Sequence, residues 1–169
     1  MRVPVIIPLI PVALLLLACA DRSAAGPGQP AFGVSWGPET PNFNLEVILR
    51  GAGAGFGLVK FRQPNDADLI IYLDTWVRGL APNTGYQLQR AVDTNIDGNC
   101  TGASWLTLGK GPTPQAIVTD DQGTGREELF RSVAAFPVGS QFDIHFRVIE
   151  AATSAVVLES GCYHYTISF

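Results

Sequence analysis

The sequence predicts an all-β domain, built as an antiparallel Greek-key β-sandwich or flattened barrel. Apolar and polar residues alternate in many short segments, which is the pattern of strands with one buried face. The chain of 169 residues also contains 18 glycines and 12 prolines, and these favour tight turns over helices. Because the alternating segments recur at short intervals with turn residues between them, they indicate a sandwich or a barrel.

The first predicted strand covers residues 43–50, where Leu45, Val47 and Leu49 share one face with Phe43. The further predicted strands are 57–62, 69–78, 86–91, 115–119, 125–130, 142–148, 155–158 and 162–169. A hairpin turn is predicted at 120–123. The clearest alternation is in 142–148, where four apolar residues are expected inside and three polar residues outside. The inner residues are Phe142, Ile144, Phe146 and Val148, and the outer residues are Asp143, His145 and Arg147.

The N-terminus predicts export and a lipid anchor. Residues 3–17 are apolar but short for a membrane span of about 20 residues, and prolines interrupt them. The motif Leu16-Leu17-Ala18-Cys19 matches the processing box of bacterial lipoprotein precursors. We therefore expect three parts, which are a signal peptide at residues 1–18, a lipidated Cys19 that opens a flexible tether at 19–30, and a single domain at 31–169. The alternative is an ordinary secretory signal that is cleaved near Ala20 or Ala24.

Composition and charge limit the partners. The formal net charge is −4, from 11 basic and 15 acidic residues, and no basic run is present, so no nucleic-acid partner is expected. The lipid anchor predicts a membrane as partner and an extracytoplasmic place in the cell envelope, either periplasmic or at the cell surface. An unknown protein or carbohydrate ligand could contact an aromatic patch, although aromatic residues in sandwiches more often belong to the core. The candidate aromatic residues are Trp36, Trp76, Trp105, Tyr163 and Tyr165.

Two cysteines remain once Cys19 is assigned to the lipid. Cys100 and Cys162 form an even pair in an exported chain, and a disulfide is the simplest interpretation. The alternative is a pair of metal-binding thiolates, but the sequence offers no further cysteines and no histidine cluster near them.

Several segments, taken in order, resemble the copper/zinc superoxide dismutase family. They are Leu49-Arg50-Gly51, residues 57–61, residues 77–80, residues 85–89, the loop ending at 98–101, residues 119–123, residues 139–145 and Cys162. At these places the family has an L-x-G strand, a G-x-x-x-F strand, an I-x-G-L turn, a G-F-H-V-H strand, its disulfide loop and a cysteine on its last strand. The resemblance implies a Greek-key fold and copper/zinc dismutase chemistry.

The chain departs from the family at the metal sites. In the family the G-F-H-V-H strand supplies two copper-binding histidines, and the matching positions are Gln87 and Gln89. An amide oxygen is a poor substitute, since copper and zinc favour imidazole nitrogen. The loop at 101–114 contains neither the histidines nor the aspartate that the family uses for metal. The family arginine that guides superoxide matches Glu159, whose carboxylate would repel an anion.

His145 is a weak candidate copper ligand. It matches another copper-binding histidine of the family, yet one histidine cannot form a site with three or four donors. The simpler interpretation is a hydrogen-bonded residue on one face of a strand.

Asp93, Asn95 and Asp97, followed by Gly98, match the first half of a calcium loop. The closing acid is absent, because the twelfth position is Ser104. The alternative is a surface turn in which Asp and Asn side chains cap their own backbone.

The sequence therefore predicts no catalytic residue and no resident cofactor. It predicts a lipid-anchored, extracytoplasmic, dismutase-like domain that acts as a binding or envelope-structural module. Two alternatives remain open: a divergent metal-dependent superoxide dismutase or copper-binding lipoprotein, and a calcium-stabilised adhesive module.

Overall fold

The computed structural model describes residues 33–35, 43–64 and 67–168, all within the unit Ala31–Phe169. The expected signal peptide at 1–18, the lipidated Cys19, the tether at 19–30 and Trp36 lie outside the described residues. Within the described ranges, no helix has the length and apolar character that crossing a membrane requires.

Four long strands form one half of the sheet, and all pair antiparallel with their neighbours. They are β2 (Phe43–Arg50), β3 (Phe56–Gln63), β4 (Ile70–Arg78) and β10 (Gly125–Ser132), in that order across the sheet. The short β1 (Gly33–Ser35) pairs with β2. β2, β3 and β4 follow one another in the sequence and pair in that order, whereas β10 joins β4 from farther along the chain.

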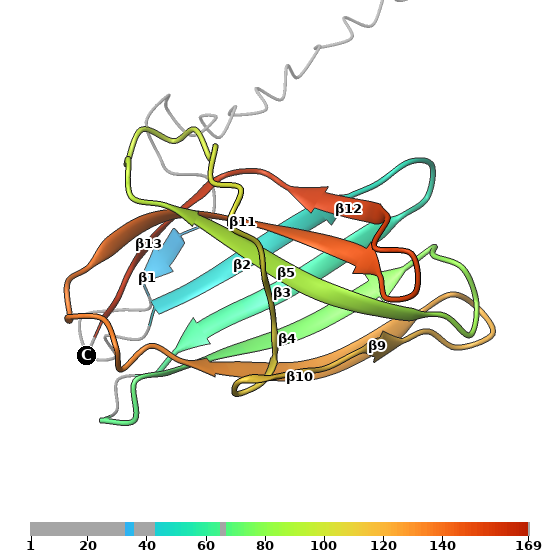
Figure 1. Cartoon of the computed structure of the whole chain (residues 1–169), viewed down its shortest axis with the longest axis horizontal. Coiled ribbons are helices and arrows are strands. Elements are labelled where there is room, and N and C mark those ends of the chain that lie inside the picture. Colours follow the sequence, from blue (N-terminus) through green and yellow to red (C-terminus); the bar gives the residue numbers. More distant parts are fainter. Residues whose placement is uncertain (1–32, 36–42, 65–66, 169) are drawn as a thin grey trace, which may run out of the picture. The chain divides into compact units, whose positions relative to one another are not determined.

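The other half is organised around β11. Its strands are β5 (Gly85–Asp93), β11 (Gln141–Glu150), β12 (Val156–Ser160) and β13 (Tyr163–Thr166). β11 pairs antiparallel with β5 along one edge and with β12 and β13 along the other. β12 also pairs with β2, which joins the two halves into one continuous sheet (Figure 1).

A crossing segment of four very short strands bridges the remaining gap. The strands are β6 (Leu106–Thr107), β7 (Gly109–Lys110), β8 (Thr113–Pro114) and β9 (Ile117–Val118). β6 and β9 pair with β5, whereas β7 pairs with β10, and Figure 1 shows this yellow segment running from β5 to β10. The described sheet is therefore all-β, mostly antiparallel and closed into a nearly complete barrel, as the alternation predicted.

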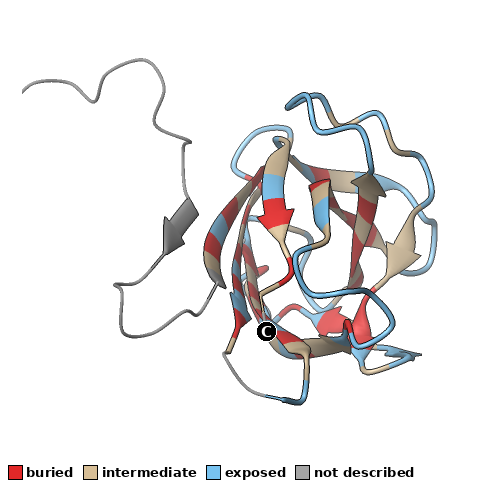
Figure 2. Ribbon diagram, turned by 90° about the vertical axis from the view of Figure 1, so that its left-hand side faces the viewer, coloured by how far each residue is buried: buried red, intermediate tan, exposed pale blue. Residues whose placement is uncertain are grey.

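Buried side chains alternate with exposed ones along the long strands (Figure 2). Leu45, Val47 and Leu49 are at most 3% exposed, which confirms the predicted inner face of the first strand. The ring of Phe61 lies at the centre of the core, edge-on to Tyr165 at 4.8 Å and to Phe146 at 6.3 Å between ring centroids.

The aromatic candidates divide between core and surface. Tyr165 is buried, whereas Trp76, Trp105 and Tyr163 are half-buried. They come from β4, the loop before β6 and β13.

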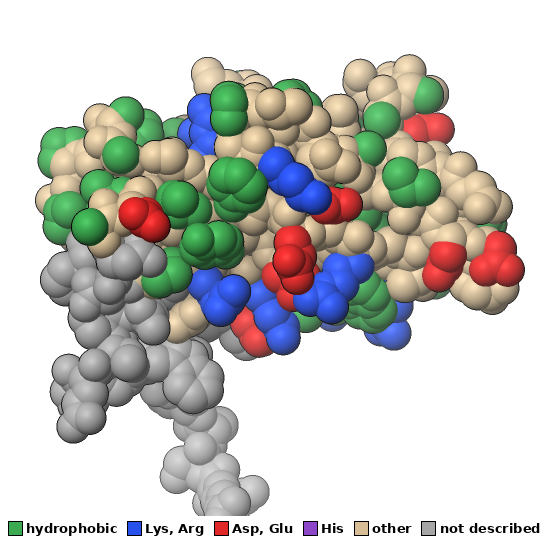
Figure 3. Space-filling model, turned by 90° about the horizontal axis from the view of Figure 1, so that it is seen from below, with side chains coloured by type: hydrophobic (Ala, Val, Ile, Leu, Met, Phe, Trp, Pro, Cys, Tyr) green, Lys and Arg blue, Asp and Glu red, His purple; other side chains and the backbone are tan. Residues whose placement is uncertain are grey.

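Ion pairs link charged side chains of β4, β7 and β10. Arg126 donates from Nε and Nη2 to the two carboxylate oxygens of Asp74, each at 2.8 Å, and Lys110 lies 2.8 Å from Glu127. Figure 3 shows basic and acidic side chains next to one another in this view. These exposed charges therefore pair with one another.

The structure corrects two expectations. The strand predicted at 115–119 is limited to Ile117–Val118. Gln115 and Thr119 on either side donate their backbone N–H groups to the carbonyls of Leu108 and Thr84, outside the strand pairing. Asp143 was expected outside; it does lie on the outer face of β11, but it is only 1% exposed. The loop that follows β5 covers it, and the alternation along β11 alone could not reveal that cover.

Candidate functional site

The face of β5 and β11 that points away from the core carries the residues compared above with copper ligands. The register sets Arg147 opposite Gln89 and Ile149 opposite Gln87, while His145 lies opposite Ala91. All of them share one face, because alternate residues of a strand point the same way. His145 is therefore not directly across from either glutamine.

Both ends of the Gln89 amide are engaged. Arg147 Nε donates to Gln89 Oε1 at 2.7 Å, and Gln89 Nε2 donates to Thr107 Oγ1 at 2.9 Å. Thr107 belongs to β6, which pairs with β5 beside Gln89. The side chain is only 9% exposed, so these bonds satisfy a largely buried amide and attach the crossing segment to the barrel.

Trp105 packs over this network. The guanidinium carbon of Arg147 lies 4.0 Å from the Trp105 ring centroid, within the range of a cation–π contact. The His145 ring also contacts Trp105, with 4.6 Å between the two ring centroids. We call these residues, together with Gln89 and Thr107, the Trp105 cluster.

A backbone carbonyl holds the His145 ring in place. Nε2 of His145 lies 2.9 Å from the carbonyl oxygen of Gly102, and since a carbonyl only accepts, this nitrogen carries the hydrogen and donates. In this arrangement Nε2 has no lone pair to offer a metal, and Nδ1 is the ring nitrogen that could bind one.

The donors of the Trp105 cluster do not fit a copper or zinc centre. They are one imidazole nitrogen, an amide oxygen that already accepts from arginine, and a threonine hydroxyl. Copper and zinc sites in proteins use several imidazoles, thiolates or carboxylates. The guanidinium of Arg147 also places a positive charge where a metal cation would have to approach Gln89.

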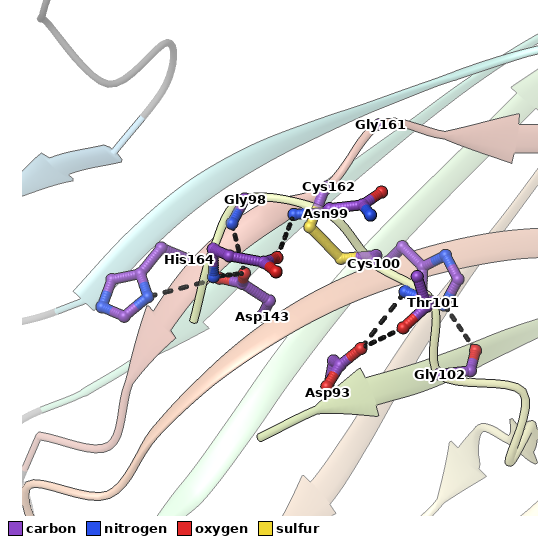
Figure 4. Close-up of a disulfide and its surroundings, with 12 residues drawn as sticks. Asp93, Gly98, Asn99, Cys100, Thr101, Gly102, Asp143, Gly161, Cys162 and His164 are labelled. Carbon is purple, nitrogen blue, oxygen red and sulfur yellow. Dashed lines mark hydrogen bonds and ion pairs between the residues drawn. A yellow bond between two sulfur atoms is a disulfide. The ribbon is translucent and has the colours of Figure 1, made fainter. Parts of the chain in front are cut away.

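A disulfide closes the loop at 93–102 over one end of this face. Cys100 and Cys162 are bonded, with 5.3 Å between their Cα atoms and a sequence separation of 62. The bond joins the loop after β5 to the residue before β13 (Figure 4). The predicted disulfide is thus confirmed.

Asp143 on β11 holds the same loop through hydrogen bonds. Its Oδ2 accepts hydrogen bonds from the backbone N–H of Gly98 at 2.7 Å and of Asp97 at 3.0 Å. Its Oδ1 lies 3.5 Å from Nδ1 of His164 on β13, as Figure 4 shows. The buried carboxylate therefore ties the loop, β11 and β13 together.

The calcium candidates lie in this loop and cap its backbone. Asp93 accepts from the Asn95 N–H at 3.0 Å and from both the N–H and the hydroxyl of Thr101, at 3.2 and 2.7 Å. These hydrogen bonds, that of the Thr101 hydroxyl first, lower the pKa of Asp93. Asp97 accepts from the backbone N–H of Asn99 at 2.9 Å and from the side-chain amide of Asn95. The carboxylate oxygens of Asp93 and Asp97 thus serve the turn itself.

Within residues 43–64 and 67–168, no group of three or more His, Cys, Asp or Glu side chains is arranged to hold a metal ion. Arg147 and Thr107 are the members of the Trp105 cluster that sequence reasoning missed as site residues. The alternation along β11 places Arg147 on the outer face, but nothing in the sequence sets its register against Gln89. Thr107 has no signal of its own in the crossing segment.

Comparison with known proteins assigns no family. No protein-family model matches the chain. A search of curated proteins likewise finds no significant match.

Proposed function

We propose that this protein is a lipid-anchored extracytoplasmic binding domain that resembles copper/zinc superoxide dismutase and lacks its metal centre. One observation carries the proposal: Arg147 bonds to Gln89 at the position where the resemblance would place a copper-binding histidine. The amide of Gln89 is a poor substitute for an imidazole as a ligand of a redox metal, and the positive charge of Arg147 beside it disfavours a metal cation.

The order of the segments supports the resemblance. The L-x-G and G-x-x-x-F matches fall at the end of β2 and on β3, and the match to G-F-H-V-H falls on β5. The disulfide links the loop after β5 to the residue before the last strand. This order along the chain supports the proposed resemblance.

Electrostatics also favour a non-catalytic role. Superoxide is an anion, and an enzyme that removes it quickly gains from positive charge at the entrance to its site. Glu159, at the position of the family's guiding arginine, is exposed and lies opposite Arg147 in the pairing of β11 with β12. Its carboxylate opposes the approach of an anion from solvent.

The lipid anchor is tested by localisation. The full precursor is expected in the membrane fraction and is released by detergent, whereas Cys19→Ser is expected in the soluble extracytoplasmic fraction. Mass spectrometry of the membrane form should find the lipid on Cys19. An unlipidated N-terminus beyond residue 19 would refute this part of the proposal.

The absence of catalysis is tested by superoxide removal after exposure to copper and zinc. The full chain is incubated with both metals, dialysed and assayed against a buffer control that was treated identically. We expect the two rates to agree, and we expect His145→Ala to match the parent. Fast removal that disappears in His145→Ala would show a metal-dependent dismutase and overturn the proposal.

A further inference from the structure

The barrel has an open seam between β5 and β10. At the Gly125 end, β9 lies against β5 and contacts β10. Farther along, β6 pairs with β5 at Arg90 and β7 pairs with β10 at Phe130. Beyond this level, in the described part of the chain, no strand pairing joins the two edges, and a cavity of about 270 Å³ opens there.

The cavity walls are mainly apolar. They include Ile71, Val92, Phe142, Ile144, Tyr165 and Ile167, which come from strands on both sides of the seam and from the C-terminal segment. The exposed ring of Phe136, 43% accessible, packs edge-on against Phe142 at the rim. Small-molecule sites are typically cavities lined by apolar side chains with only a few polar groups.

Two arginines enter this cavity from the inner side of their strands. Arg90 continues the inward row that begins with Tyr86 and Leu88, both at most 3% exposed. Arg131 follows Leu129, which is 1% exposed, in the inward row of β10. Both side chains are half-buried and line the cavity. They stand where the alternation of each strand would otherwise place an apolar residue.

Neither arginine has a carboxylate partner among the described residues. Arg131 Nη1 donates to the Gly111 carbonyl at 3.5 Å, which is a weak contact. Burial, and then the charge of Arg131, lower the pKa of Arg90. Both guanidinium groups nevertheless stay charged at neutral pH, so two like charges line an apolar cavity, and none of the described residues pairs a carboxylate with either of them.

We propose that this seam cavity binds a small alkyl carboxylate, whose head group pairs with Arg90 and Arg131 and whose chain fills the apolar interior. A carboxylate matches the guanidinium group geometrically and relieves the repulsion between the two cations. Since a water molecule takes about 30 Å³, the cavity holds roughly ten non-hydrogen atoms, which is the size of octanoate. The proposal deepens the proposed function by naming a ligand class, and it rests on residues that the metal-site argument does not use.

Octanoate, octanol and octylamine are the probes. Each probe is titrated into the isotopically labelled full chain, which carries Cys19→Ser. The chemical shifts of the protein are followed by NMR. We expect octanoate to bind at least tenfold more tightly than octanol, with octylamine weakest. The largest changes in chemical shift are expected at Val92, Ile144 and Ile167, which line the cavity. This mapping uses the unaltered cavity and therefore does not depend on how any arginine variant folds.

Variants then test the head group. Arg90→Gln and Arg131→Gln are each expected to weaken octanoate binding about tenfold and to leave octanol binding unchanged. Arg126→Gln, an exposed arginine paired with Asp74, is the matched control and should bind octanoate like the parent.

Equal affinity for all three probes, or shift changes outside the cavity, would overturn the inference. Inward charges would then serve only to protect an open sheet edge from pairing with other chains. That outcome would leave the metal test of the proposed function unaffected. Conversely, a positive dismutase assay would not alter the octanoate result.

Discussion

Removal of the Cys100–Cys162 disulfide should destabilise the domain substantially. The cross-link spans 62 positions of sequence, and in the chain-entropy model a loop of that size lowers the free energy of folding by about 4 kcal/mol at 25 °C. Unfolding entropy is about 2.1 cal/mol/K per residue, or about 0.3 kcal/mol/K for a domain of roughly 140 residues. A loss of about 4 kcal/mol therefore predicts a decrease in melting temperature of about 14 °C.

The assay is thermal unfolding followed by circular dichroism. The double variant Cys100→Ser/Cys162→Ser and the parent in the presence of a reductant should melt at the same lowered temperature. Cys19→Ser, which leaves the disulfide intact, is the control and should melt like the parent. A decrease of less than about 3 °C in the double variant, corresponding to less than about 1 kcal/mol, would refute the reasoning.

Three further predictions concern the loop and the core. Asp143→Ala removes the carboxylate that accepts the backbone N–H groups of Asp97 and Gly98, and the loss of these two charge-assisted hydrogen bonds should cost about 2–3 kcal/mol in urea unfolding. The exposed Glu159→Ala should change stability by less than about 0.5 kcal/mol; equal effects would contradict the role given to Asp143. Phe61→Ala should cost about 4 kcal/mol, and a loss below about 1 kcal/mol in the same assay would mean that this ring is not at the core. The pKa of Asp93 is lowered from its ordinary value of 3.8, so its contribution to stability is complete above that value and is lost as the pH falls through the lower, folded pKa. The melting temperature of Asp93→Asn should therefore decrease less than that of the parent between about pH 5 and pH 2. Equal decreases in the two proteins would contradict the hydrogen-bonding role given to the Asp93 carboxylate.

Much of the fold could be predicted because strand alternation is a local property. The first long strand is observed at the predicted residues, Phe43–Arg50, and the strand predicted at 142–148 lies within β11, Gln141–Glu150. The crossing segment was predicted only in part. Its strands have two residues each, too few for a period to show, and they are held by pairing with β5 and β10 that no local pattern encodes.

The candidate site depended on contacts between distant segments. Gln87, Gln89 and His145 are evident in the sequence. The register of β5 against β11 decides that Arg147 lies opposite Gln89. The burial of Asp143 likewise depends on a loop that the disulfide holds over β11. Charged residues at inward positions 90 and 131 interrupt the alternation, and that irregularity was the available signal for the seam cavity.

Copper binding to the full chain is the most direct test of the central claim, that the Trp105 cluster is not a metal centre. One equivalent of Cu²⁺ is added, and the electron paramagnetic resonance spectrum is compared with that of Cu²⁺ in the same buffer. We expect the two spectra to agree, and we expect copper to be lost on dialysis. A distinct spectrum with coupling to several nitrogen nuclei, abolished in His145→Ala, would contradict the account.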